Sequence, residues 1–195
     1  MKTTFLFCAL LNFACSIQGQ RTFIYDQQSA VENTGGGGAV SIQSNQPIGQ
    51  SFTPTLSSVG FIRLFAGGAS GTTLYVNLRT NSITGPILGQ TDLISFVGTF
   101  TGYSNFFFST PVTLIPGATY YFQPVLQSGN GVVVAYDSYN YPGGNAFEQG
   151  VSLPSIDLWF REGIVVPEPS SLSLIIGSGV LFYVGRKKIK MRSIS

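Results

Sequence analysis

The stretch Thr73-Leu74-Tyr75-Val76-Asn77-Leu78-Arg79 carries the clearest structural signal in this chain of 195 residues. Its apolar residues Leu74, Val76 and Leu78 alternate with polar or amphipathic ones. A period of two residues is typical of a β-strand with one buried face. We therefore predict a half-buried strand over residues 73–79.

Nine further segments have similar short apolar runs and predict strands. They are residues 22–25, 40–42, 50–53, 61–65, 93–97, 106–108, 118–123, 132–136 and 157–161. The chain between them is rich in Gly, Ser, Thr and Pro, which favours turns over helices. Ten short strands indicate an all-β domain that folds as a two-sheet sandwich.

Glycine-rich and proline-rich segments mark the connections between these strands. Residues 67–71, Gly85-Pro86 and residues 128–131 supply residues that tolerate positive φ, and we predict hairpin turns there. Pro116-Gly117 has the composition of the centre of a type II turn.

The charges are divided unevenly between the ends and the middle of the chain. Six of the ten basic residues lie in the terminal segments. Residues 21–166 contain four arginines, no lysine and seven acidic residues, a net charge of −3. Because this middle part offers no basic stripe, we predict no nucleic-acid partner.

The inventory of reactive side chains is small. Both cysteines, Cys8 and Cys15, lie in the N-terminal apolar segment, and the chain has no histidine. The middle part therefore lacks the residues for thiol chemistry, for Ser-His-Asp catalysis and for the usual zinc sites. We predict no catalytic residue, no metal site and no cofactor.

The N-terminus has the three-part layout of a secretory signal peptide. Lys2 precedes an apolar run over residues 5–14, and small residues follow at Ser16 and Gly19. An N-terminal membrane anchor is the alternative, but ten apolar residues are too few to span a bilayer. We predict a signal peptide over residues 1–19 and an exported sandwich over residues 20–163.

Residues 164–195 combine three signals in a fixed order. The motif Pro167-Glu168-Pro169 leads into an uncharged stretch over residues 170–185. A basic cluster follows, made of Arg186, Lys187, Lys188, Lys190 and Arg192. As a helix the uncharged stretch rises about 24 Å, so it spans a hydrocarbon core of about 30 Å only marginally. The basic residues act as a stop-transfer signal and keep this end in the cytoplasm.

This tail, over residues 165–192, resembles the PEP-CTERM sorting signal of exported bacterial proteins. The resemblance implies an inner-membrane anchor, transient or permanent, and processing near Pro167-Glu168-Pro169 by an exosortase, a membrane enzyme. The two prolines fix φ and remove two amide donors, so the motif stays extended and separate from the helix. The alternative is a rigid spacer before an ordinary single-span anchor.

The middle part resembles the choice-of-anchor domains that many PEP-CTERM proteins carry. The resemblance rests on Gln50-Ser51-Phe52-Thr53, the Pro-Gly-x-x-Tyr turn at residues 116–120, Tyr141-x-Gly143-Gly144 and Asp157-Leu158-Trp159-Phe160-Arg161. It implies a jelly-roll-like sandwich outside the cell, and it implies no activity.

Aromatic residues suggest a site for a sugar. Tyr136, Tyr139 and Tyr141 lie among short polar residues in a predicted loop, and strand alternation turns Trp159 away from its two neighbours. Aromatic faces stack on the C–H surfaces of sugar rings while polar side chains bind hydroxyls. The alternative is structural: the tyrosines cap the open end of the sandwich, and Trp159 packs under a loop.

Two further patterns give weaker indications. The close carboxylate pairs Asp137 with Glu148 and Asp157 with Glu162 bring to mind a polysaccharide hydrolase, but their spacing gives this no support and nothing indicates a raised pKa. The four glycines at residues 35–38 are followed by no lysine, so we predict a flexible loop and no phosphate site.

Together these patterns predict an exported, non-enzymatic protein of the cell surface or extracellular matrix with a structural or adhesive role. The alternative is a carbohydrate-binding module for extracellular polysaccharide.

Overall fold

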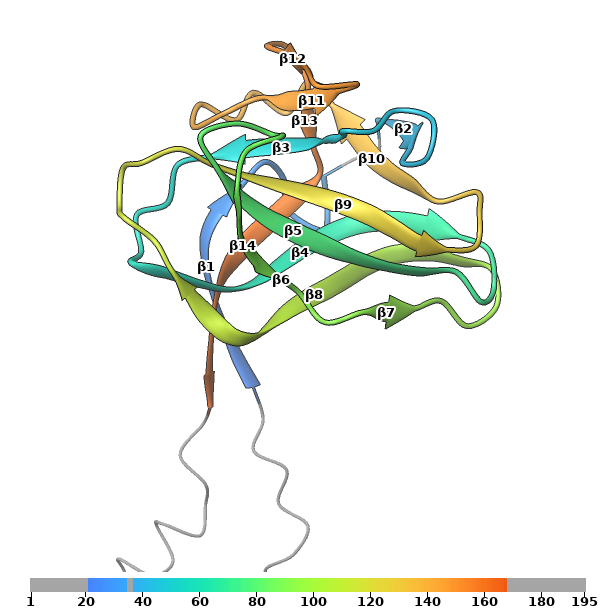
Figure 1. The fold of residues 1–195 in the computed structure, drawn as a ribbon, viewed down its shortest axis with the longest axis horizontal. Coiled ribbons are helices and arrows are strands. Elements are labelled where there is room, and N and C mark those ends of the chain that lie inside the picture. The colour runs from blue at the N-terminus through green and yellow to red at the C-terminus, as the bar shows by residue number, and fades with distance from the viewer. Residues whose placement is uncertain (1–20, 35–36, 168–195) are drawn as a thin grey trace, which may run out of the picture. The chain divides into compact units, whose positions relative to one another are not determined.

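The computed structural model describes residues 21–34 and 37–167, which fold into two antiparallel β-sheets stacked as a sandwich (Figure 1). These residues contain no helix, and so none long and apolar enough to cross a membrane. The prediction of an all-β sandwich is confirmed. The predicted signal peptide over residues 1–19 and the predicted helix over residues 170–185 lie outside the described residues.

The first sheet, sheet A, has seven strands. They are β1 (Arg21–Gln28), β2 (Gly38–Ser41), β4 (Ser58–Gly68), β8 (Phe100–Thr113), β10 (Val133–Asp137), β13 (Asp157–Leu158) and β14 (Phe160–Pro167). β14 lies between β1 and β4, and β10 lies between β4 and β13, while β8 pairs with β4 and β2 pairs with β10. The first and last strands of the described chain are therefore neighbours in one sheet (Figure 1).

The second sheet, sheet B, also has seven strands. They are β3 (Gly49–Phe52), β5 (Thr73–Thr80), β6 (Ile87–Gln90), β7 (Ile94–Ser95), β9 (Tyr120–Ser128), β11 (Ala146–Glu148) and β12 (Val151–Leu153). Their order is β12-β11-β3-β9-β5-β6, and β7 pairs with β5.

The main core lies between the two sheets and is rich in phenylalanine. Phe52 and Phe122 of sheet B and Phe160 of sheet A are fully buried. The ring centroids of Phe122 and Phe160 are 5.2 Å apart, so these two residues join the sheets. Leu74, Val76 and Leu78 are also fully buried, as their alternation predicts, and each such apolar side chain stabilises the fold by about 1.5–3 kcal/mol.

The structure has a strand at each of the ten predicted positions. The predicted strand over residues 157–161 is divided at Trp159 into β13 and β14. The strands β6, β11 and β12 were not predicted. They are only three or four residues long, which leaves too few residues for a clear alternation.

The turn predictions are confirmed in conformation and only partly in connectivity. Gly71, Gly117, Gly129 and Gly131 all have positive φ, and the Ala118 amide donates to the Ile115 carbonyl over 3.1 Å, as a type II turn requires. The turn after β5 forms the predicted hairpin with β6. The other two predicted hairpins are wrong, because residues 67–71 and 128–131 lead from one sheet to the other.

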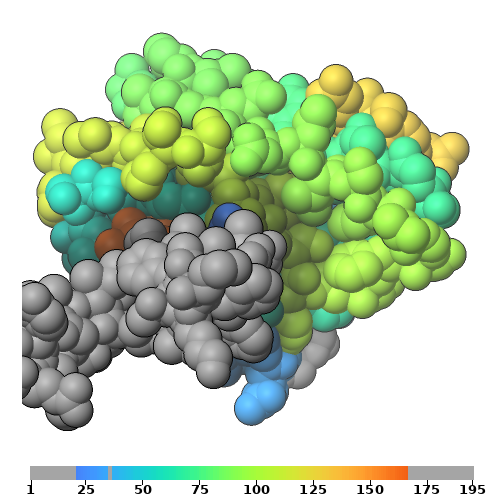
Figure 2. Space-filling model, turned by 90° about the horizontal axis from the view of Figure 1, so that it is seen from below, coloured from blue at the N-terminus to red at the C-terminus, as the bar shows by residue number. Residues whose placement is uncertain are grey.

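One edge of the sandwich carries exposed apolar side chains. Seen from below, the segment with β6, β7 and the start of β8, coloured green to lime, forms much of the visible surface (Figure 2). Ile87, Leu93 and Val97 in this segment are at least half exposed. Phe96 belongs to the main core and Ile94 of β7 packs against it, so the core holds this edge through these two residues.

Candidate functional site: an aromatic pocket on the outer face of sheet A

A second, smaller apolar cluster lies apart from the main core. It contains Ala30, Ala135 and Trp159, with Phe65, Tyr103 and Tyr139 packed against it. Leu158 and Phe160 belong to the main core, so the strand alternation places Trp159 on the opposite face of sheet A. The backbone amide of Trp159 donates to the Ala135 carbonyl over 2.9 Å, which holds the tryptophan beside β10.

This cluster borders a pocket of about 340 Å³. Phe65, Tyr103 and Trp159 contribute aromatic side chains from the strands of sheet A and the junction between β13 and β14, and Tyr139 contributes another from the segment after β10. The rest of the lining is small: Thr34, Gly37, Gly38, Ala39, Gly67, Thr101, Val133 and Ala135. The volume lies at the lower end of the range for small-molecule sites, about 300–1,000 Å³.

The polar groups of the pocket are few, and two of them, Trp159 Nε1 and the Tyr139 hydroxyl, lack a hydrogen-bond partner in the described chain. Trp159 is only 3% exposed, and its indole Nε1 has no hydrogen-bond partner among the described residues. Such a buried, unpaired donor is uncommon, because leaving it unpaired costs about 1–3 kcal/mol. Burial raises the pKa of Tyr139, and the negative charge of Asp137 raises it further, so the Tyr139 hydroxyl stays protonated at neutral pH.

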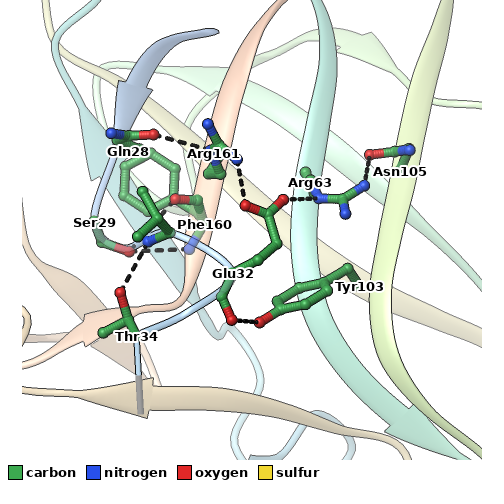
Figure 3. Close-up of polar contacts among 10 residues, drawn as sticks. Gln28, Ser29, Glu32, Thr34, Arg63, Tyr103, Asn105, Phe160 and Arg161 are labelled. Carbon is green, nitrogen blue, oxygen red and sulfur yellow. Dashed lines mark hydrogen bonds and ion pairs between the residues drawn. The ribbon is translucent and has the colours of Figure 1, made fainter. Parts of the chain in front are cut away.

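The segment between β1 and β2 is fastened to sheet A by one carboxylate. Figure 3 shows Glu32 between two arginines of neighbouring strands, with Oε1 3.0 Å from Arg63 Nε and Oε2 2.6 Å from Arg161 Nη1. The Tyr103 hydroxyl donates to the Glu32 carbonyl over 2.5 Å. We call this arrangement the Glu32 clamp. It ties a pocket-lining aromatic ring directly to the segment that borders the pocket.

Further hydrogen bonds fix the two ends of this segment, and Figure 3 shows those of Ser29 with Phe160 and of Thr34. The Ser29 hydroxyl donates to the Leu158 carbonyl over 2.6 Å, and its oxygen accepts from the Phe160 amide over 3.0 Å. The Val31 amide donates to the Thr34 hydroxyl oxygen over 3.0 Å. Thr34, which lines the pocket, is thereby held in a turn, and the pocket has a defined border on this side.

The pocket is uncharged. No lysine, arginine, aspartate or glutamate belongs to its described lining. Two charged side chains lie next to lining residues: Asp137 acts on Tyr139, and the guanidinium carbon of Arg63 lies 5.1 Å from the centroid of the Tyr103 ring. Glu32 pairs with both arginines, so the clamp as a whole carries one positive charge, and none of its three charged side chains belongs to the pocket lining.

The structure separates the four aromatic residues that the sequence singled out. Tyr139 and Trp159 meet at the pocket. Tyr141 belongs to the main core: its hydroxyl donates to Gln27 Oε1 over 3.0 Å, and burial raises its pKa to about 12. Tyr136 also packs against the main core. The burial of Trp159 agrees with the structural alternative, in which this residue packs under a loop. The pocket nevertheless lies beside it.

Sequence reasoning missed Phe65 and Tyr103. Phe65 ends its predicted strand, and its neighbours Leu64 and Ala66 are apolar, so alternation gives no signal for an outer face there. Tyr103 precedes the predicted strand over residues 106–108. Their meeting depends on the register of β4 and β8, where Phe65 lies directly opposite Tyr103. Single-strand periodicity carries no information on that register.

Only one residue of the predicted sorting motif is described. Pro167 is the last residue of β14, so the chain is extended where the motif begins. Glu168, Pro169 and the basic residues Arg186, Lys187, Lys188, Lys190 and Arg192 lie outside the described residues.

The carboxylates considered for hydrolysis serve other contacts. Asp157 accepts from Gln50 Nε2 over 2.8 Å and from the Tyr141 amide over 2.9 Å. Asp137 is in β10 of sheet A, whereas Glu148 is in β11 of sheet B. In residues 21–34 and 37–167, no three His, Cys, Asp or Glu side chains are grouped so that they could hold a metal ion.

Glu162 has a property that the sequence did not indicate. Burial raises the pKa of its carboxyl group to about 9, and the nearby Asp26 carboxylate adds to this shift. Glu162 is therefore protonated at neutral pH. The sequence did not indicate the raised pKa, because alternation shows only that residue 162 faces inward. It does not show that the Asp26 carboxylate lies nearby.

Comparison with models of protein families gave no match for this chain, and a search among curated proteins found no significant match.

Proposed function

We propose that this chain is an exported, non-enzymatic protein of the cell surface or extracellular matrix, with a structural or adhesive role. The observation that carries the proposal is that the outermost strands of the described chain, β1 and β14, are neighbours in sheet A. The chain between the predicted signal peptide and the predicted sorting motif therefore folds as one sandwich whose two ends lie together, which suits a single exported body.

The proposal includes the finer assignments that came from sequence resemblance. The sandwich is jelly-roll-like, the segment over residues 170–185 anchors the chain in the inner membrane, and an exosortase-type enzyme processes it at Pro167-Glu168-Pro169. An extended backbone at Pro167 supports this, since a processing enzyme needs an extended peptide.

The contacts of the acidic residues support a role without catalysis. Asp26 accepts from the backbone amides of Thr55 and Leu56 over 2.8 and 2.9 Å. Glu32 forms the clamp, and Asp157 joins β13 to sheet B through Gln50. These side chains hold strands and loops in place, which is a structural task.

The intact mass of the mature protein tests the export proposal. The protein is recovered separately from membranes and culture medium, in strains with and without the processing enzyme. We expect a species that ends near Pro167 and that disappears without the enzyme. A Glu168→Ala variant should accumulate unprocessed, whereas Glu148→Ala, a change in β11, should be processed normally. A membrane-bound chain that ends at Ser195 in both strains would contradict the proposal and leave an ordinary anchor.

The carbohydrate-binding alternative is favoured by one observation, the aromatic pocket with its unpaired Trp159 Nε1.

A further inference from the structure

We propose that the pocket bordered by Phe65, Tyr103, Tyr139 and Trp159 binds a neutral sugar ring, and that the ring belongs to an extracellular polysaccharide. This inference deepens the proposed function and rests on it, because it names the chemistry through which an exported adhesive protein would hold matrix. It also redefines the site predicted from sequence, since Phe65 and Tyr103 replace Tyr136 and Tyr141.

The aromatic rings are arranged as a concave lining. Phe65 and Tyr103 meet at 79° with centroids 5.1 Å apart, and Tyr103 and Trp159 meet at 40° with centroids 4.5 Å apart. Because the rings are tilted against one another, both ring faces and ring edges line the pocket. A sugar ring fits such a space because its C–H surface is apolar and packs on aromatic faces.

The polar atoms of the pocket distinguish a sugar from a hydrocarbon. Trp159 Nε1 is a buried donor without a partner, and a sugar hydroxyl would accept its hydrogen bond. Thr34 and Thr101 add hydroxyl groups to the lining. The Thr34 oxygen accepts from Val31 and keeps its own hydrogen to donate. A hydrocarbon would leave the indole donor unpaired.

The absence of charge in the described lining selects a neutral ligand. A uronic acid would bring a carboxylate into a pocket whose described lining has no cationic side chain to pair with it. Burying an unpaired carboxylate is costly, so acidic sugars should bind more weakly than neutral ones.

The border of the pocket is preorganised. The Glu32 clamp and the Ser29 hydrogen bonds fix the segment of residues 29–34 on sheet A before any ligand arrives. A ligand therefore does not have to order this segment, which lowers the entropic cost of binding.

Trp159 is the sole tryptophan of the chain, so its fluorescence reports on the pocket alone. The full chain is purified in a zwitterionic detergent, because the sugar headgroups of glycoside detergents would compete. Methyl glucoside, methyl galactoside, N-acetylglucosamine and cellobiose are titrated separately. We expect a saturable change of the Trp159 emission with at least one of them, and weaker binding of glucuronic acid and of indole.

A matched pair of variants tests the location. Thr101 lines the mouth of the pocket and is exposed in β8, so Thr101→Tyr should fill the pocket and weaken binding by about tenfold or more. Thr110 is exposed further along the same strand, and Thr110→Tyr should bind like the unmodified protein. If Thr101→Tyr does not fold, Ala39→Leu blocks the pocket from β2.

Three outcomes would overturn the inference: no neutral sugar changes the emission, indole binds and sugars do not, or the two threonine variants weaken binding equally. Because the assay uses purified chain, it does not depend on processing. Absent binding with a normally processed chain would refute the pocket alone. Sugar binding by a chain that always ends at Ser195 would refute the proposed processing alone.

Discussion

Tyr141 of the main core and Trp159 of the outer-face cluster are both buried aromatic residues, but they differ in whether their polar atom has a hydrogen-bond partner. In the core, the Tyr141 hydroxyl donates to Gln27 and lies 3.3 Å from the Thr53 amide, which donates to it. In the outer cluster, Trp159 Nε1 has no partner in the described chain, and a hollow of about 340 Å³ lies beside it. The paired tyrosine hydroxyl serves stability, and the unpaired donor of a residue that lines a hollow suits a ligand.

The contrast extends to adjacent residues of one strand segment. Phe160 points between the sheets and contacts Phe122 and Tyr141, with ring centroids 5.2 and 5.1 Å apart. Trp159 points to the other face and lines the pocket. The same extended backbone thus supplies a core residue and a site residue in alternation.

Phe160→Ala should have the largest effect on the free energy of unfolding. Phe160 is fully buried, so its truncation leaves a cavity and should cost about 3–5 kcal/mol. Trp159→Phe should cost less than about 2 kcal/mol, because it removes an unpaired donor beside an existing hollow. Urea unfolding of the full chain in detergent measures both. Equal losses would show that the two clusters are packed alike.

Glu162→Gln should change how stability depends on pH. The pKa of Glu162 is about 9 in the folded protein against 4.5 for the ordinary group, so its contribution is complete below pH 4.5 and is lost as the pH rises towards 9. The loss is at most about 1.4 kcal/mol per pH unit, or up to about 2.8 kcal/mol between pH 6 and pH 8. Urea unfolding at a series of pH values measures it, and the glutamine variant should lack this slope.

Asp26→Asn provides the control for the cause of that slope. Removing the Asp26 carboxylate should lower the pKa of Glu162 and move the end of the stability loss to lower pH. An unchanged slope in Glu162→Gln would mean that another group titrates. Asp26 itself acts in the opposite direction, because its lowered pKa contributes stability that disappears only in acid.

Glu32→Gln should have the smallest effect on global stability and a local effect on the outer face. The Glu32 side chain is 34% exposed, so losing its ion pairs should cost about 1 kcal/mol or less. Hydrogen exchange should speed up at the Thr34 amide, which donates to the Val31 carbonyl. Glu148→Gln in sheet B should leave that exchange unchanged. Unchanged exchange in both variants would show that the clamp does not hold the segment.

The tyrosines of the predicted loop show a limit of prediction from the sequence, namely the direction in which each side chain points. Composition placed Tyr139 and Tyr141 together in a possible site. In the structure Asn140 has φ of 59°, a left-handed conformation that breaks the extended path between them. Asn tolerates this conformation, but nothing in the sequence requires it. One tyrosine therefore faces the pocket and the other enters the core.

The sequence alone determined the position of the longer strands and the buried face of segments such as residues 73–79, because a two-residue alternation depends only on local geometry and hydrophobicity. Only the tertiary structure decided which side chains meet. Phe65 faces Tyr103 through the register of two strands, and Glu32 reaches Arg161 across 129 positions of the chain. Such contacts follow from how whole sheets pair and stack, and no local pattern encodes that pairing.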